Sequence, residues 1–274
     1  MKFTHSVRLF SLGAVVGVSS LFGAAFIDSA AKQVGVETSL VASAHAQAKK
    51  KVTLKLPGIS KNVFDMIGEV TALIAPNTEE NPDAKPDWNG GLAELAKMEK
   101  KCKDKCNTVE TAQIFRFYGY VYFQMENTSK ALSSYKRVVE MSPEIPVALE
   151  LEALNILSQL SYSVDEYDDA LKYLTQWMNL STVVGADKYY QRGLIYYSKN
   201  DKKNSLRDVS TAIKMVEEGP KKVAKEQWYG LQRSLFLEKE DFKNALVVLK
   251  KLVRHYPKHA YWSQLAQVYG LLER

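Results

Sequence analysis

The chain has 274 residues, and 46% of them are hydrophobic, which is enough to bury a sizeable core. Its formal net charge is only +6, from 37 basic and 31 acidic residues. The lysine-rich runs at 49–51, 97–105 and 221–225 are mixed with acids or lie between predicted helices. A nucleic-acid groove would concentrate Lys and Arg on one face, so the sequence argues against a nucleic-acid partner.

Residues 1–46 have the layout of an export signal. Lys2 and Arg8 precede an apolar run over 9–27, and the A-x-A sequence at 44–46 is a cleavage signature. An uncleaved inner-membrane anchor is the alternative, because the run approaches the ~20 residues that span a bilayer. Either reading places the rest of the chain outside the cytoplasm, in the periplasm. No cysteine directly follows the run, so no lipid anchor is predicted, and no further membrane span is expected.

The next part of the chain is predicted to be a weakly conforming hairpin. Residues 47–60 are basic and polar, as in a disordered or extended lead-in. Apolar side chains recur at helical spacing over 63–74 and 91–101, with a polar loop over 76–91 between them. We interpret residues 61–107 as a degenerate first helical hairpin with a long loop. The Gly90–Gly91 pair is expected to break or cap a helix, since no phosphate-binding motif follows it.

The chain has two cysteines, Cys102 and Cys106. In an oxidising compartment such a near pair often closes into a disulfide. A structural metal site would need four ligands, and three residues separate this pair instead of the two typical of redox-active motifs. We therefore predict a small loop-closing disulfide, with free thiols as the alternative, and no redox catalysis.

A repeat pattern begins after these cysteines. Its conspicuous positions are Phe115, Tyr118, Gly119, Tyr122, Ala131, Tyr135 and Pro143. They match the W-x2-L-G-x2-Y…A-x3-F…P pattern of the 34-residue tetratricopeptide repeat. Gly119 and Ala131 are small where the two helices of one hairpin cross. Pro143 is expected to stop the second helix, because proline lacks an N–H and clashes with the preceding turn.

The pattern recurs with drift in three more copies and in the first half of a fifth. The close-contact positions of the repeat fall at 119, 158, 193, 233 and 266. We predict an all-α fold, a solenoid of stacked antiparallel hairpins with about four and a half repeats over 108–274; an ordinary helical bundle is the alternative. The last helix is apolar, so it either packs back as a cap or belongs to a longer protein, which we favour.

No catalytic set is found, and the protein is predicted not to be an enzyme and to need no cofactor or metal. His255 and His259 have the spacing of a zinc pair on one helical face. Pro257 lies between them at a repeat junction and breaks that face, so the pair is interpreted as chance.

The better candidate for a site is a concave groove lined by the first helix of each hairpin. Tyr and Arg are enriched at binding hot spots, and Asn and Gln can hydrogen-bond to the backbone of a bound peptide. The predicted groove residues are Arg116, Tyr120, Gln124, Asn155, Gln159, Tyr190, Leu194, Tyr197 and Ser234. The alternative for the tyrosines is that they pack between hairpins.

The chain also resembles a narrower family, the exported tetratricopeptide proteins of Gram-negative bacteria that accompany TonB–ExbB–ExbD systems. The resemblance rests on residues 54–63, 115–122, 167–174, 226–233 and 261–270. It implies a periplasmic protein that binds TonB or ExbD segments and supports outer-membrane uptake, for example of iron–siderophore complexes. An adaptor in outer-membrane or cell-wall assembly is the alternative.

Overall fold

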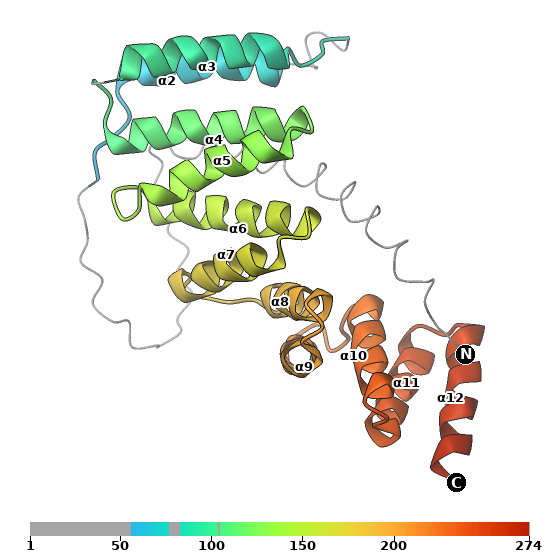
Figure 1. Ribbon diagram of the computed structural model, residues 1–274. Helices are drawn as coiled ribbons and strands as arrows, with labels where there is room; N and C mark the ends of the chain where they lie inside the picture. Colours follow the sequence, from blue (N-terminus) through green and yellow to red (C-terminus); the bar gives the residue numbers. More distant parts are fainter. Residues whose placement is uncertain (1–55, 77–82, 104, 274) are drawn as a thin grey trace. The chain divides into compact units, whose positions relative to one another are not determined.

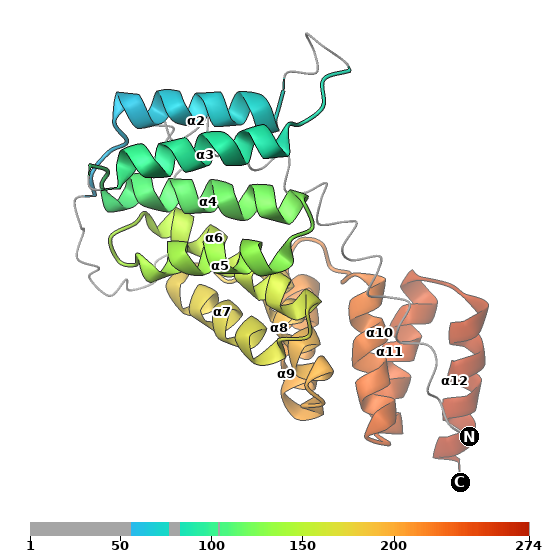
Figure 2. The same cartoon turned by 45° about the horizontal axis from the view of Figure 1, so that its top comes forward.

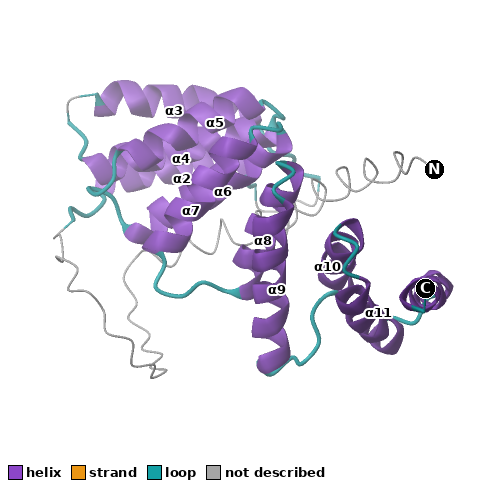
Figure 3. Ribbon diagram, turned by 60° about the horizontal axis from the view of Figure 1, so that its bottom comes forward, coloured by secondary structure: helices purple, strands orange, loops and turns teal. Residues whose placement is uncertain are grey.

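The computed structural model describes residues 56–76, 83–103 and 105–273. The predicted export signal and residues 47–55 of the lead-in lie outside the described residues. Within the described part, the chain forms eleven helices and no strand (Figure 3). They are α2 (Lys61–Ile74), α3 (Trp88–Cys102), α4 (Thr108–Gln124), α5 (Thr128–Glu140), α6 (Val147–Ser163), α7 (Tyr167–Leu180), α8 (Ala186–Ser198), α9 (Lys202–Glu218), α10 (Glu226–Glu238), α11 (Phe242–His255) and α12 (His259–Leu272).

The helices pack as hairpins in chain order (Figure 1). α2 pairs with α3, and the pairs α4/α5, α6/α7, α8/α9 and α10/α11 follow, each packed against the next. α12 packs on α11. Figure 2 shows α2 and α3 running side by side, next to α4. The all-α array of stacked hairpins predicted from the sequence is confirmed.

The two helices of a hairpin cross closely at the small residues of the repeat. A Cβ atom added to Gly119 would lie 2.6 Å from the ring of Tyr135, which is 2% exposed. In the next hairpin, Ser158 Oγ donates to the carbonyl oxygen of Ala170 at 2.9 Å. In the hairpin α8/α9 the direction is reversed, since Ser205 Oγ donates to the carbonyl of Gly193 at 2.8 Å. Small side chains at these positions therefore set the distance between paired helices.

We expect Gly119→Ala to lower the free energy of unfolding by about 1–2 kcal/mol. Overpacking against the rigid, buried Tyr135 ring costs more than the ~1 kcal/mol that alanine gains over glycine in a helix. Gly230→Ala is the matched control, because no atom lies within 4 Å of an added Cβ on α10. Denaturant unfolding should show the control unchanged or stabilised. Stabilisation by both substitutions would contradict the close crossing.

The turn inside each repeat hairpin uses one left-handed residue. These residues are Glu126, Asp165, Asn200 and Glu240, with φ of 58°, 62°, 61° and 56°. In three hairpins the following residue caps the second helix by accepting a hydrogen bond from the N–H three residues on; these caps are Asn127, Asp201 and Asp241. Side-chain oxygens at this position satisfy an N–H that the helix leaves unpaired. A left-handed turn residue therefore recurs once in each repeat hairpin, as the close helix crossing does.

The glycine pair at 90–91 corrects one prediction. Both residues lie in the first turn of α3, not in a loop, and the helix begins at Trp88 after the N-cap Asp87. Asp87 Oδ1 accepts a hydrogen bond from the N–H of Gly90 at 2.8 Å. A Cβ on Gly91 would lie 2.4 Å from Ile74 of α2. The pair allows α3 to start early and to approach α2 closely.

The last helix presents apolar side chains to solvent. Val268 is buried, whereas Trp262 is 56% exposed and Tyr269 is 41% exposed. Leu271 and Leu272 are also exposed. α12 therefore does not have the polar outer face typical of a capping helix.

Candidate partner-binding surface

The predicted binding residues all lie on the first helices of successive hairpins, and we call them the first-helix surface. α4 carries Arg116, Tyr120 and Gln124; α6 carries Asn155 and Gln159; α8 carries Tyr190, Leu194 and Tyr197; and α10 carries Ser234. Helices that occupy the same place in consecutive hairpins bring side chains one repeat apart next to one another. The contacts of these residues decide which of them can meet a partner.

On α4, two of the predicted residues are buried. Arg116 is 4% exposed, and its Nε donates to Glu152 Oε1 of α6 at 2.8 Å. Tyr120 is 8% exposed, and its ring meets that of Trp88 on α3 edge-on, with centroids 6.2 Å apart. The prediction that these two side chains line an open groove is wrong, because neighbouring helices on both sides of α4 contact them. Gln124 remains half-buried.

On α6 and α8, the surface is polar and half-buried. Lys188 Nζ donates to Asn155 Oδ1 and, at 3.4 Å, to Gln191 Oε1. The same ammonium lies 4.6 Å from the centroid of the Trp177 ring. Gln159 and Leu194 are also half-buried. Amide, cationic and apolar groups are therefore combined where the hairpins α6/α7 and α8/α9 meet.

The predicted tyrosines of α8 join this helix to α10. The ring of Tyr190 stacks on Trp228, with centroids 4.9 Å apart, and burial raises the pKa of its hydroxyl. Tyr197 donates to Glu238 Oε1 at 3.0 Å, and desolvation together with this carboxylate raises its pKa. Packing between hairpins, the alternative interpretation of the tyrosines, describes both residues. Their positions are fixed before any partner arrives.

Contacts between residues one repeat apart were not predicted from the sequence. Tyr162 and Ser198 share a hydroxyl–hydroxyl hydrogen bond of 3.0 Å. Lys225 pairs with Asp187 at 2.9 Å, and Glu226 accepts from Lys258 at 2.6 Å. Opposite charges at similar repeat positions in adjacent copies are the sequence signal that could have identified the two ion pairs.

Lys188 is predicted to titrate near pH 8, well below an ordinary lysine. Burial lowers its pKa from 10.5 to about 8, and Asp187 opposes this shift only in part. Because folding disfavours the charged amine, its deprotonation makes the folded state more stable as the pH rises from about 8 towards 10.5. We expect the acylation of Lys188, followed against pH by mass spectrometry, to have its midpoint near pH 8.

Lys97 is the internal control for this titration. A hydrogen bond from its ammonium to Glu94 raises its pKa above 10.5. Its acylation profile should therefore lie at higher pH than that of Lys188. Coincident profiles for the two amines would contradict the burial of Lys188.

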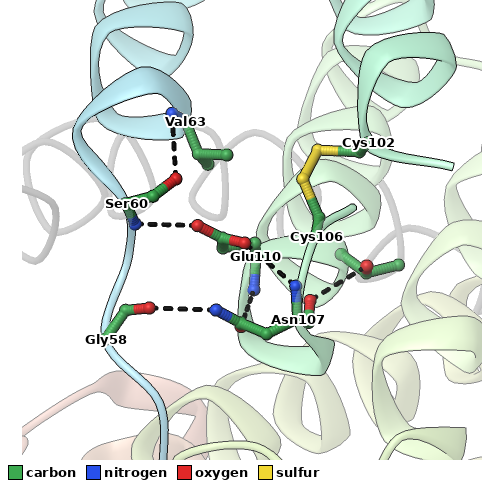
Figure 4. Close-up of a disulfide and its surroundings, with 8 residues drawn as sticks. Gly58, Ser60, Val63, Cys102, Cys106, Asn107 and Glu110 are labelled. Atoms are coloured by element: carbon green, nitrogen blue, oxygen red, sulfur yellow. Dashed lines mark hydrogen bonds between the residues drawn. A yellow bond between two sulfur atoms is a disulfide. The ribbon is translucent and has the colours of Figure 1, made fainter. Parts of the chain in front are cut away.

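A second feature of the structure, a disulfide beside a cavity, lies at the junction of α3 and α4. Cys102 and Cys106 are joined in a disulfide, with Cα atoms 4.7 Å apart. The disulfide borders a cavity of about 290 Å³, which Ser60, Met66 and Lys105 also line. Figure 4 shows the disulfide beside hydrogen bonds that join the start of α4 to residues 58–60.

The two histidines lie on different helices. His255 is the last residue of α11, and His259 is the first residue of α12. In the part of the chain that the structure describes, no group of three or more His, Cys, Asp or Glu side chains could hold a metal ion.

The described helices differ from membrane spans in length or composition. None of them combines the length and the apolar character needed to cross a bilayer.

Residues 114–145 match the family model of the tetratricopeptide repeat. The crystal structure of the MamA protein is 20% identical over 68% of this chain and 92% of its own, with a TM-score of 0.50. MamA 41-end from Desulfovibrio magneticus RS-1 is 13% identical over 72% and 96%, with a TM-score of 0.52. A tetratricopeptide repeat protein from Parabacteroides merdae is 13% identical over 78% and 75%, with a TM-score of 0.51.

A comparison with curated proteins finds no match. At these identities the likeness to solved structures concerns the fold. The described chain is thus an all-α solenoid of the tetratricopeptide-repeat type, a class of protein whose fold is suited to protein–protein interaction.

Proposed function

We propose that the protein is a non-enzymatic scaffold that binds a protein segment across α6, α8 and α10. The observation that carries this proposal is the half-buried row of Asn155, Gln159, Leu194 and Ser234 on successive first helices. Amide groups can pair with the backbone of an extended segment, and Leu194 offers apolar contact. Tyr190 and Tyr197 are held by α10, so little conformational entropy is lost when a partner binds beside them.

We further infer that the scaffold works in the periplasm as an accessory of TonB-dependent energy transduction and outer-membrane uptake. The export-signal layout of residues 1–46 supports this location. The Cys102–Cys106 disulfide is in keeping with an oxidising compartment. The resemblance of segments 226–233 and 261–270 to the TonB-associated family supports the periplasmic segments of TonB or ExbD as partners.

Photo-crosslinking in cells tests this function. A photoreactive amino acid at Gln159 or at Leu194 should trap a partner that mass spectrometry identifies as TonB or ExbD. Val247, which is 53% exposed on the second helix α11, is the control position and should trap neither.

The identity of the trapped protein separates the two functional readings. Capture of an outer-membrane or cell-wall assembly factor from Gln159 and Leu194 would replace the transport role with that of an assembly adaptor. Equal capture from Val247 would contradict the first-helix surface as the binding site.

A further inference from the structure

The start of α4 holds the last five residues of the lead-in, residues 56–60, which directly precede α2. We call these five residues the lead-in segment. Glu110 Oε1 accepts a hydrogen bond from the N–H of Ser60 at 2.7 Å. Asn107 Nδ2 donates to the carbonyl oxygen of Gly58 at 3.0 Å. Figure 4 shows both bonds crossing from α4 to the lead-in segment. These contacts link parts of the chain about 50 residues apart.

The same two α4 residues form the capping box of their own helix. Asn107 Oδ1 accepts from the N–H of Glu110 at 3.0 Å, and Glu110 Oε2 accepts from the N–H of Asn107 at 2.9 Å. Glu110 is 3% exposed. Burial opposes its ionisation, but hydrogen bonds from Ser60 and Asn107 hold its pKa below the ordinary value. The charged carboxylate therefore accepts hydrogen bonds from the helix cap and from the lead-in segment at the same time.

The disulfide fixes the position of this capping box. Cys106 immediately precedes Asn107, and the bond ties it to Cys102 at the C-terminal end of α3. The loop is tightened further by the N–H groups of Lys105 and Cys106, which donate to the carbonyl of Cys102 at 2.8 and 3.0 Å. Asn107 is thus one residue from a covalent link to α3.

The disulfide also lies beside open space. Both cysteines line the cavity of about 290 Å³, together with Lys101 and Lys105. Cys102 is 4% exposed, whereas Cys106 is half-buried. Positive charge near a disulfide favours the thiolate form of an approaching thiol. A reductant therefore has a route to the Cys106 sulfur.

We propose that the Cys102–Cys106 disulfide is a redox-controlled clamp that holds the lead-in segment on the start of α4. When the disulfide is closed, Asn107 and Glu110 are placed to bind residues 58–60. When it is reduced, the loop between α3 and α4 relaxes, the capping box loosens and the lead-in segment is released. Ser60 is also the N-cap of α2, so release extends to the first turn of that helix. This proposal is independent of the partner-binding function.

The exchange partner is a dithiol, such as that of a thiol–disulfide oxidoreductase. One thiolate of the dithiol attacks Sγ of Cys106, the Cys102–Cys106 bond breaks, and Cys102 leaves as a thiolate that takes up a proton. The second thiol of the dithiol then displaces Cys106 from the mixed disulfide. Both cysteines end as thiols and the dithiol ends as a disulfide, so two electrons and two protons have moved to the clamp.

Amide hydrogen exchange on the folded full chain, with and without excess dithiothreitol, tests the clamp. Alkylation of the two thiols, followed by mass, verifies reduction. We expect exchange in residues 58–63 and 107–111 to become at least about fivefold faster on reduction, the change that loss of a helix N-cap corresponds to. Exchange in α6–α11 should stay the same.

Two variants sharpen this test. The double substitution Cys102→Ser, Cys106→Ser should show the faster exchange without reductant and should not respond to dithiothreitol. Glu110→Gln should speed exchange in residues 58–63 while the disulfide stays closed. The proposal is overturned if reduction leaves residues 58–63 unchanged, if exchange rises equally in all helices, or if dithiothreitol reduces the disulfide only in denaturant.

Discussion

Replacing Trp228 with alanine is expected to lower the free energy of unfolding by about 3–5 kcal/mol, the cost of removing a large aromatic side chain from a core. Trp228 is 2% exposed and packs in a cluster with Val209, Ile213 and Leu252. It also supports the ring of Tyr190, at a centroid distance of 4.9 Å. The substitution therefore removes packing within the hairpin α10/α11 and between it and the hairpin α8/α9.

The same substitution at Trp262 is the matched control. That side chain is 56% exposed on α12, so Trp262→Ala should cost less than about 1 kcal/mol. Denaturant unfolding followed by circular dichroism measures both. Equal losses would show that Trp228 does not hold the hairpins α8/α9 and α10/α11 together.

The Asp208→Asn substitution is expected to cost about 3 kcal/mol, because it breaks a buried ion pair and leaves a cation without its partner. Asp208 is 1% exposed on α9. Its carboxylate accepts from Arg192 Nε at 2.5 Å and Nη2 at 3.2 Å, and from Arg207 Nε at 2.9 Å. This bidentate pair holds α8 against α9.

Asp187→Asn provides the comparison for this ion pair. The Asp187 side chain is 73% exposed, and its partner Lys225 is 60% exposed. Exposed pairs contribute roughly 0–1 kcal/mol, so this variant should unfold close to the unmodified protein. A loss at Asp208 as small as that at Asp187 would show that the buried pair is not a stabilising link.

The array was predictable because its sequence signal is local and repeated. Gly119, Ser158 and Gly193 recur where paired helices cross, and the structure places each of them at such a crossing. The early start of α3 was missed because a glycine pair is ordinarily a helix breaker. Here the contact of Gly91 with Ile74 of α2, which the local sequence does not reveal, decides the outcome.

The site was predictable at the level of helices and less so at the level of side chains. The position of each residue within its repeat placed all nine predicted binding residues on the first helices of their hairpins. It could not show that Trp88 and Glu152 contact Tyr120 and Arg116, because those contacts join different hairpins. For the same reason it left the role of Tyr190 open. A regular repeat predicts which helix face a residue occupies, and the neighbouring hairpins then determine its exposure.

Titration calorimetry with the purified chain and the periplasmic segment of TonB measures directly whether the first-helix surface binds this partner. We expect binding that Leu194→Glu on α8 weakens at least about tenfold, since a charge would enter the contact surface. Val247→Glu on α11 should bind like the unmodified chain, and circular dichroism should show both variants folded. Equal binding by the two variants would contradict the first-helix surface as the contact site, and no binding by the unmodified chain would contradict TonB as the partner.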